Sequence, residues 1–106
     1  MQVTILPFGS LRYINGSPKI ELEFNENQIC LKNVIKKIIS EPKVGEKSVE
    51  YLLNDQNAKQ KTITDDAINP ALIILINDVD YRLLGGTNAK IEDGDRVVFI
   101  PSIHGG

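Results

Sequence analysis

The chain has 106 residues, of which 42% are hydrophobic and 25% are charged, an ordinary composition for one soluble globular domain. The net charge is −2, with acidic and basic residues interspersed, so we expect no direct binding to nucleic acid. The apolar runs are too short to cross a membrane, and a single cysteine excludes a disulfide framework and a four-thiolate metal site within one chain. We therefore predict a cytoplasmic protein with no metal and no other bound cofactor.

The first third of the chain predicts a β-hairpin followed by a helix. Apolar and polar residues alternate over residues 1–6 and again over residues 19–24, which is typical of half-buried strands. An Asn-Gly pair at residues 15–16 favours a turn between the two strands. Over residues 29–39 the apolar residues recur at helical spacing, so we predict an amphipathic helix that Asn27 caps.

The second half of the chain predicts two strands that are apolar on both faces. Residues 43–69 are polar and irregular, and the sequence leaves their structure open. Residues 71–76 and 96–100 are continuous apolar runs, a pattern typical of central strands. Asn77-Asp78 favours a turn into a further short strand at residues 79–81.

This order of elements predicts an α+β fold in which one main helix packs across one face of a mixed sheet. It is the outline of a single-domain β-grasp, although other α+β folds share the same order. We expect the domain to span residues 1–100 and residues 101–106 to form a flexible C-terminal tail. Because one helix covers only one face of a sheet, we predict that Val98 and Ile100 form a docking surface on the other face.

The tail is the part of the chain that is suited to chemistry. Six extended residues reach at most about 20 Å, which is far enough to place Gly106 in the active site of another protein. Gly105 and Gly106 have no side chains that would obstruct a narrow channel, although two terminal glycines alone are also typical of a frayed end. A terminal carboxylate is ionised at neutral pH and is a poor electrophile, so it needs activation from outside.

The sequence contains no apparatus for that activation. We find no glycine-rich phosphate loop and no cysteine–histidine pair with an identifiable partner. We therefore expect no catalytic residue in this chain and predict a carrier protein that is the substrate of an activating enzyme. ATP would be used by that partner enzyme and would not be bound here.

Two motifs in the last third of the chain are specific. Residues 75–80 read Leu-Ile-Asn-Asp-Val-Asp, followed by the aromatic Tyr81, and the sequence ends in Ile-His-Gly-Gly. Together they closely resemble the ubiquitin-related modifier family of sulfur carriers. Two parts of the chain depart from the family pattern, which usually has tryptophan where Tyr81 stands and Ser-Thr-Leu in place of Pro-Ser-Ile at residues 101–103.

The resemblance implies a ubiquitin-like β-grasp whose terminal Gly106 is adenylated by an activating enzyme of the ubiquitin-activating type. A persulfide on that enzyme then yields a thiocarboxylate. The sulfur passes through a separate thiolase complex to the wobble uridine of certain tRNAs, so tRNA is reached only indirectly, and the terminus can also be attached to lysines of other proteins. By the same resemblance, Ile103, His104 and Gly105 lie in the tail that the activating enzyme grips.

Two other functions stay open on the sequence alone. Pro101 makes the end of the chain similar to small sulfur-carrier subunits of molybdopterin synthase, which often carry prolines before a terminal Gly-Gly. The third possibility is a ubiquitin-like binding module that is never activated. The internal Leu-Leu-Gly-Gly at residues 83–86 imitates a ubiquitin-like ending, but cleavage there would remove the final strand, so we predict a turn.

Overall fold

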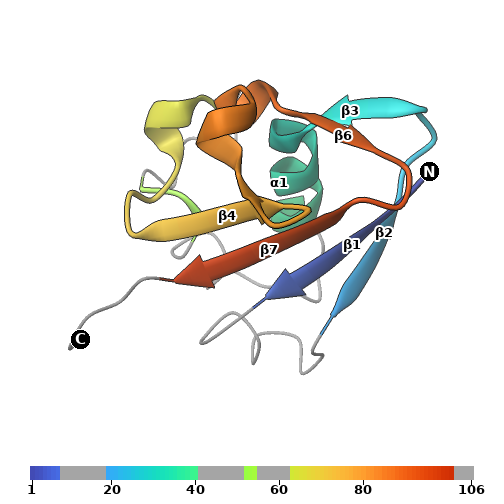
Figure 1. Cartoon of the computed structure of the whole chain (residues 1–106), viewed down its shortest axis with the longest axis horizontal. Coiled ribbons are helices and arrows are strands. Elements are labelled where there is room, and N and C mark those ends of the chain that lie inside the picture. The colour runs from blue at the N-terminus through green and yellow to red at the C-terminus, as the bar shows by residue number, and fades with distance from the viewer. Residues whose placement is uncertain (8–18, 41–51, 55–62, 102–106) are drawn as a thin grey trace.

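A mixed five-stranded sheet and one helix form the described part of the chain (Figure 1). The computed structural model describes residues 1–7, 19–40, 52–54 and 63–101. In chain order, the elements are β1 (Gln2–Pro7), β2 (Ile20–Glu23), β3 (Gln28–Cys30), α1 (Leu31–Ser40), the 3-10 turn η3 (Asp65–Ala67), β4 (Leu72–Ile76), β5 (Val79–Asp80), the 3-10 turns η4 (Tyr81–Leu84) and η5 (Gly86–Asn88), β6 (Lys90–Glu92) and β7 (Arg96–Pro101).

Strand β7 lies at the centre of the sheet, whose strand order is β2-β1-β7-β4-β5. β1 runs parallel to β7, whereas β1–β2, β4–β7 and β4–β5 are antiparallel pairs. The predicted hairpin of residues 1–6 and 19–24 is confirmed by the β1–β2 pairing, while its Asn-Gly turn lies outside the described residues. The central position predicted for residues 96–100 is also confirmed.

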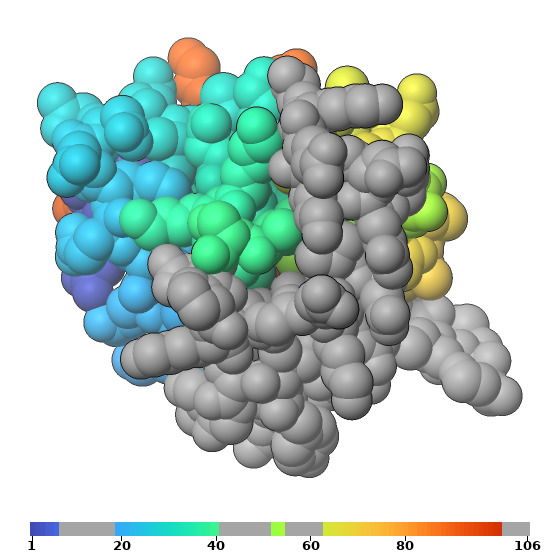
Figure 2. Space-filling model, turned by 180° about the vertical axis from the view of Figure 1, so that it is seen from behind, coloured from blue at the N-terminus to red at the C-terminus, as the bar shows by residue number. Residues whose placement is uncertain are grey.

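Helix α1 covers one face of the sheet, and Figure 2 shows its outer surface from behind. The helix buries Leu31, Val34, Ile35 and Ile38, which recur at the spacing of one helical face. These residues belong to one core cluster with the inward-facing residues of the sheet, including Val3, Ile5, Val97 and Phe99. This arrangement of one helix across a mixed sheet confirms the predicted β-grasp architecture.

The predicted start of the helix was wrong, and so was the cap at Asn27, because the residues after Asn27 form β3. This strand pairs with β6 in a separate two-stranded sheet, in which Ile29 lies opposite Ile91 and both are buried. The helix begins at Leu31, and the N–H of the preceding residue, Cys30, donates to the side chain of Asn33 at 2.9 Å. Ile29 also fits the apolar spacing of the helix. A strand of three residues is too short to show an alternation that would distinguish it from the helix.

The segment that the sequence left open contributes to the core. Among its described residues, Leu53 and Ile68 form an isolated antiparallel bridge, and both are buried. Ile63 is also buried, with 1% of its surface exposed. The polar segment 43–69 therefore carries a few apolar residues that close one end of the core.

Candidate functional site at the exit of the C-terminal strand

The predicted reactive tail lies outside the described residues, which end at Pro101. Gly106 and its neighbours Ile103, His104 and Gly105 therefore remain predictions from the sequence. What the structure describes is the strand from which the tail leaves. Strand β7 continues through Pro101, so it ends one residue later than predicted. In Figure 1 its arrowhead lies at the end of the sheet that is opposite the N-terminus.

Strand β7 is paired on both sides up to Phe99 and with β4 to its end. Near its end, Phe99 lies opposite Pro7 of β1 and Ile74 of β4, and the last residue, Pro101, lies opposite Leu72 of β4. Phe99 has only 1% of its surface exposed, so the helix-facing side of the strand is anchored in the core. The tail therefore starts from a fixed position at the end of the sheet.

The predicted docking residues lie on the face opposite the helix. Val98 is paired with Leu6 and Leu75, and Ile100 is paired with Ile73, so all five side chains share this face. Val98 is nevertheless buried, with 8% of its surface exposed, although it does not belong to the core cluster. Ile100, Ile73 and Leu75 are half-buried. The docking surface stays a prediction, and its accessible part lies around Ile100.

The Asn-Asp pair of the family motif has a structural role. Asn77 and Asp78 have φ angles of 49° and 72°, the left-handed conformation of a tight turn between β4 and β5. The Asn77 side chain donates to Asp95 at 2.9 Å and accepts from the Arg96 N–H at 3.0 Å. It therefore ties this turn to the beginning of β7.

The second aspartate of the motif ends the short strand. The Asp80 carboxylate accepts from the Arg82 N–H at 2.9 Å and from its guanidinium at 2.8 and 3.1 Å. These donors from Arg82, its side chain above all, hold the pKa of Asp80 below its ordinary value. Because Asp80 caps η4, Tyr81 begins that 3-10 turn, and the predicted strand 79–81 is only two residues long.

The internal Gly-Gly forms a turn, as predicted. Gly85 and Gly86 have φ angles of 109° and 67°, which favour glycine. A Cβ added to Gly86 would collide with the Asp65 carboxylate. That carboxylate accepts from the Thr87 N–H at 2.7 Å and from its hydroxyl at 2.8 Å. These hydrogen bonds, the backbone one first, lower the pKa of Asp65 and join η3 to η5.

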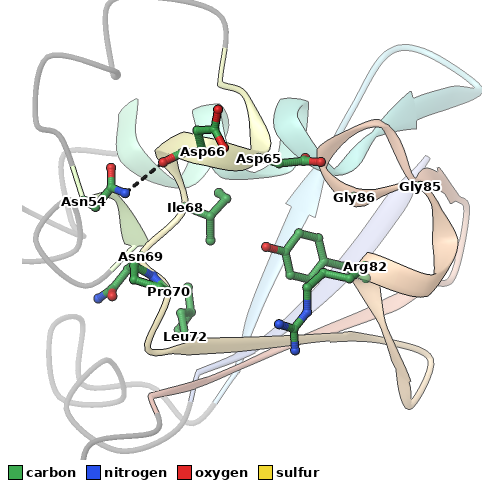
Figure 3. Close-up of a pocket in the computed structure, with 11 residues that line it drawn as sticks. Asn54, Asp65, Asp66, Ile68, Asn69, Pro70, Leu72, Arg82, Gly85 and Gly86 are labelled. Carbon is green, nitrogen blue, oxygen red and sulfur yellow. Dashed lines mark hydrogen bonds between the residues drawn. The ribbon is translucent and has the colours of Figure 1, made fainter.

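A pocket of about 480 Å³ lies between η3, the start of β4 and η4 (Figure 3). Its buried lining residues include Ile68, Leu72 and Tyr81, and the polar residues Asp65, Asp66 and Arg82 also line it. Sequence reasoning missed this pocket because its walls come from separate segments that share no pattern.

Within the described ranges, no group of three histidine, cysteine, aspartate or glutamate side chains is placed to hold a metal ion. No helix in the same part of the chain is long and apolar enough to span a membrane.

One helix packs across one face of a mixed sheet, and the last strand of the chain lies at the centre of that sheet. These features define a ubiquitin-like β-grasp protein. The fold is shared with the small archaeal modifier protein 1 from Methanosarcina acetivorans, with a TM-score of 0.74 at 21% identity over 99% of this chain and 96% of that chain.

Two further solved structures share the fold. A chain of the Amycolatopsis orientalis BexX/CysO complex has a TM-score of 0.65 at 21% identity, covering 98% of this chain and 99% of that one. The putative molybdopterin converting factor, subunit 1, from Pyrococcus furiosus has a TM-score of 0.64 at 22% identity, covering 96% and 98%. At such identities the likeness concerns the fold alone.

Sequence comparison identifies the family. Residues 9–106 match the family model of Urm1, the ubiquitin related modifier. A ubiquitin-related modifier 1 homolog from Dictyostelium discoideum is 32% identical over 111 residues, covering the whole of both chains. The ubiquitin-related modifier 1 of Saccharomyces cerevisiae (strain YJM789) is 41% identical over 58 residues, covering 55% of this chain and 59% of that protein. The chain belongs to the ubiquitin-related modifier family, which confirms the resemblance of its motifs.

Proposed function

We propose that the chain is a sulfur carrier, active in the cytoplasm, whose Gly106 carboxylate is adenylated and converted to a thiocarboxylate by an activating enzyme. The observation that carries this proposal is the position of β7, a central strand fixed on both sides, which ends at Pro101 and leads towards the Gly-Gly end. Membership of the ubiquitin-related modifier family supports the same class of function. No catalytic role is assigned to any residue of this chain.

The proposed chemistry has three steps, all in the partner's active site. A Gly106 carboxylate oxygen attacks the α-phosphorus of ATP, and pyrophosphate leaves as the acyl-adenylate forms. The terminal sulfur of an enzyme persulfide then attacks the acyl carbon, which expels AMP and leaves an acyl disulfide. A second thiol of the enzyme cleaves the S–S bond, so the enzyme is oxidised to a disulfide and the thiocarboxylate stays on the carrier.

In these steps, the role of the chain is to present its C-terminal tail to the activating enzyme. The exit of β7 sets where the tail starts, and the predicted tail contacts Ile103, His104 and Gly105 would lie in the channel of the activating enzyme. The matched Amycolatopsis chain comes from a complex of BexX with CysO, which is consistent with a carrier fold that works while bound to a partner. Ile100 and its neighbours on the open face of the sheet are the proposed docking surface for such an enzyme.

We infer that the sulfur passes through a tRNA thiolase complex to the wobble uridine of tRNA, and that the activated terminus can also be attached to lysines of target proteins. A second candidate is the small subunit of molybdopterin synthase. It is favoured by Pro101 and by the fold shared with the putative molybdopterin converting factor subunit. We rank tRNA thiolation first, and membership of the ubiquitin-related modifier family supports this order.

Intact-mass spectrometry of the chain purified together with its activating enzyme tests the activation. We expect a fraction of the protein to be heavier by the difference between one sulfur and one oxygen atom, and deletion of Gly106 to remove that fraction. A thiocarboxylate that survives the deletion would refute the proposal. Restoration of tRNA thiolation, but not of molybdenum-cofactor synthesis, in cells lacking their own carriers would decide between the two acceptors.

A further inference from the structure

We propose that the pocket between η3, β4 and η4 is a docking site for an arginine side chain of a partner protein. The pocket has a volume of about 480 Å³, within the range of about 300–1,000 Å³ typical of small-ligand sites. Its buried residues Ile68 and Leu72 offer apolar surface, and Figure 3 shows them between the polar residues of the rim. The methylene stem of an arginine packs well on such a surface while its charged end reaches polar groups.

The first polar feature is the hydroxyl of Tyr81. Tyr81 has only 6% of its surface exposed, and its hydroxyl makes no hydrogen bond to any described residue. No fully buried side-chain oxygen or nitrogen in the described ranges lacks a partner, so this hydroxyl keeps contact with solvent. Tyr81 lines the pocket, and we therefore assign its solvent-accessible hydroxyl to the polar groups of the pocket. Burial raises the pKa of Tyr81, so the phenol stays neutral and its oxygen accepts from a cation.

The second feature is negative charge on the rim. Thr87 occupies one oxygen of the Asp65 carboxylate, and the other oxygen makes no hydrogen bond within the described part of the chain. The Asp66 side chain is exposed, and its carboxylate has no ion pair among the same residues. Arg82 adds little positive charge because Asp80 pairs with its guanidinium. The pocket therefore attracts a cation.

The spread of the acceptors favours arginine over lysine. Asp65, Asp66 and Tyr81 offer oxygens from separate residues around one cavity. A guanidinium presents five N–H donors in a planar fork and is more weakly hydrated than an ammonium, so it can contact several such oxygens at once. A lysine ammonium acts as a compact point charge and would satisfy fewer of them.

The location of the pocket indicates which partner carries the arginine. Leu72, one of its lining residues, is the register partner of Pro101, from which the tail leaves. A protein that holds the chain at Pro101 would therefore lie next to the strand that supplies Leu72 to the pocket. Arginine binding itself is independent of the proposed function, whereas the identity of the partner as the activating enzyme rests on it.

An NMR titration of the full ¹⁵N-labelled chain tests the binding. The probes are N-acetyl-arginine amide, its lysine counterpart, and N-acetyl-citrulline amide, which has the shape of arginine without the charge. We expect the arginine probe to shift the amides of Ile68, Arg82 and Thr87, the lysine probe to bind several-fold more weakly, and the citrulline probe to leave them unchanged. Absence of shifts with the arginine probe, or equal shifts with all three probes, would overturn the proposal.

Variants locate the binding groups. Tyr81→Phe removes only the hydroxyl and should weaken arginine binding about tenfold, as expected for a hydrogen bond to a charged group. Asp66→Asn should weaken it about two- to fivefold, as for an exposed charge pair. Glu26→Gln removes an exposed charge that does not line the pocket and should change nothing. Unchanged binding in both pocket variants would place the arginine elsewhere and contradict the inference.

Adenylation kinetics with the activating enzyme separate this inference from the proposed function. Tyr81→Phe and Asp66→Asn should raise the KM for the carrier and leave kcat unchanged, because the pocket residues would bind the partner and take no part in the reaction. Deletion of Gly106 should abolish adenylation altogether. Adenylation that survives the deletion refutes the proposed function, whereas an unchanged KM in the pocket variants overturns only the assignment of the arginine to the activating enzyme.

Discussion

Two regions of the chain carry the family resemblance, and they have different roles. The inner region, residues 75–87, contains the Asn-Asp-Val-Asp motif and the first Gly-Gly pair, and its side chains hold elements of the fold together. The predicted tail, residues 101–106, contains the second Gly-Gly pair and begins at the last residue of the central strand β7.

The same dipeptide therefore meets two different requirements. In the inner region, Gly86 is required by its positive φ and by the Asp65 carboxylate that occupies the space of a Cβ. In the tail, the proposed requirement concerns the carboxylate of Gly106 and the lack of side chains beside it. A motif that identifies a family can thus report its fold in one place and its chemistry in another.

The largest expected effect separates the two regions completely. Deletion of Gly106 should abolish adenylation, measured as pyrophosphate release with the activating enzyme, because the new terminal carboxylate, on Gly105, ends about 3.5 Å short of the original position. The free energy of unfolding should change by less than about 0.5 kcal/mol, as for a surface change away from the core. A deletion variant that is still adenylated, or one that is strongly destabilised, would contradict this division.

A substitution in the inner Gly-Gly pair should have the opposite effect, a loss of stability without a loss of adenylation. Gly86→Ala should lower the free energy of unfolding by about 2–5 kcal/mol, because a left-handed conformation costs an L-residue about 1–2 kcal/mol and crowding against Asp65 adds about 1–3 kcal/mol. Chemical denaturation measures the loss, and adenylation of the folded fraction should be unchanged.

Gly94→Ala provides the matched control for this prediction. Gly94 has a φ of 86°, but no heavy atom lies within 4 Å of the position that a Cβ would take there. Its substitution should therefore cost only the conformational term, about 1–2 kcal/mol. Equal losses at Gly86 and Gly94 would show that the contact with Asp65 contributes nothing.

Asn77→Ala tests whether the family motif serves the fold. The variant loses the hydrogen bonds to Asp95 and Arg96 and places alanine at a φ of 49°, so we expect a loss of about 2 kcal/mol in the free energy of unfolding. Hydrogen exchange should become faster at the beginning of β7. Asn77→Gly should recover the conformational part of the loss only; a full recovery would mean that the two side-chain hydrogen bonds are unimportant.

The strands and the helix were predictable where the pattern was long. The apolar runs of β4 and β7 indicated central strands, and the helical spacing indicated α1. Strands β3 and β6 were missed because each has three residues and Ile29 fits either period. Their pairing joins residues 28–30 to residues 90–92, which no local pattern indicates.

The two candidate sites differ in the same way. The tail could be predicted because its chemistry depends on consecutive residues at one end of the sequence. The pocket could not, since the fold brings Asp66 and Leu72 beside Tyr81 from segments without a common motif. The Asp65–Thr87 link likewise spans 22 residues and begins in a segment that the sequence left unreadable.

The smallest expected effect concerns that link and its dependence on pH. The hydrogen bonds from Thr87 depress the pKa of Asp65 below its ordinary value of 3.8, so the folded state binds this proton less readily than the unfolded state. The stabilisation is therefore fully present above the unfolded pKa and is lost as the pH falls through the lower folded pKa. Asp65→Asn keeps an oxygen acceptor for Thr87 but removes the negative charge that strengthens these hydrogen bonds, so it should cost about 1 kcal/mol at neutral pH.

Denaturation of the parent chain and Asp65→Asn across the acid range measures this dependence. The difference between their free energies of unfolding should be constant near neutrality and should shrink below about pH 4. Asp66→Asn is the matched control, because its carboxylate makes no hydrogen bond within the described residues, and its difference from the parent should stay small throughout. An Asp65→Asn difference that grows as the pH falls would reverse the sign of the linkage. Asp65 would then not be held ionised by Thr87, and the link between η3 and the inner region would need another origin.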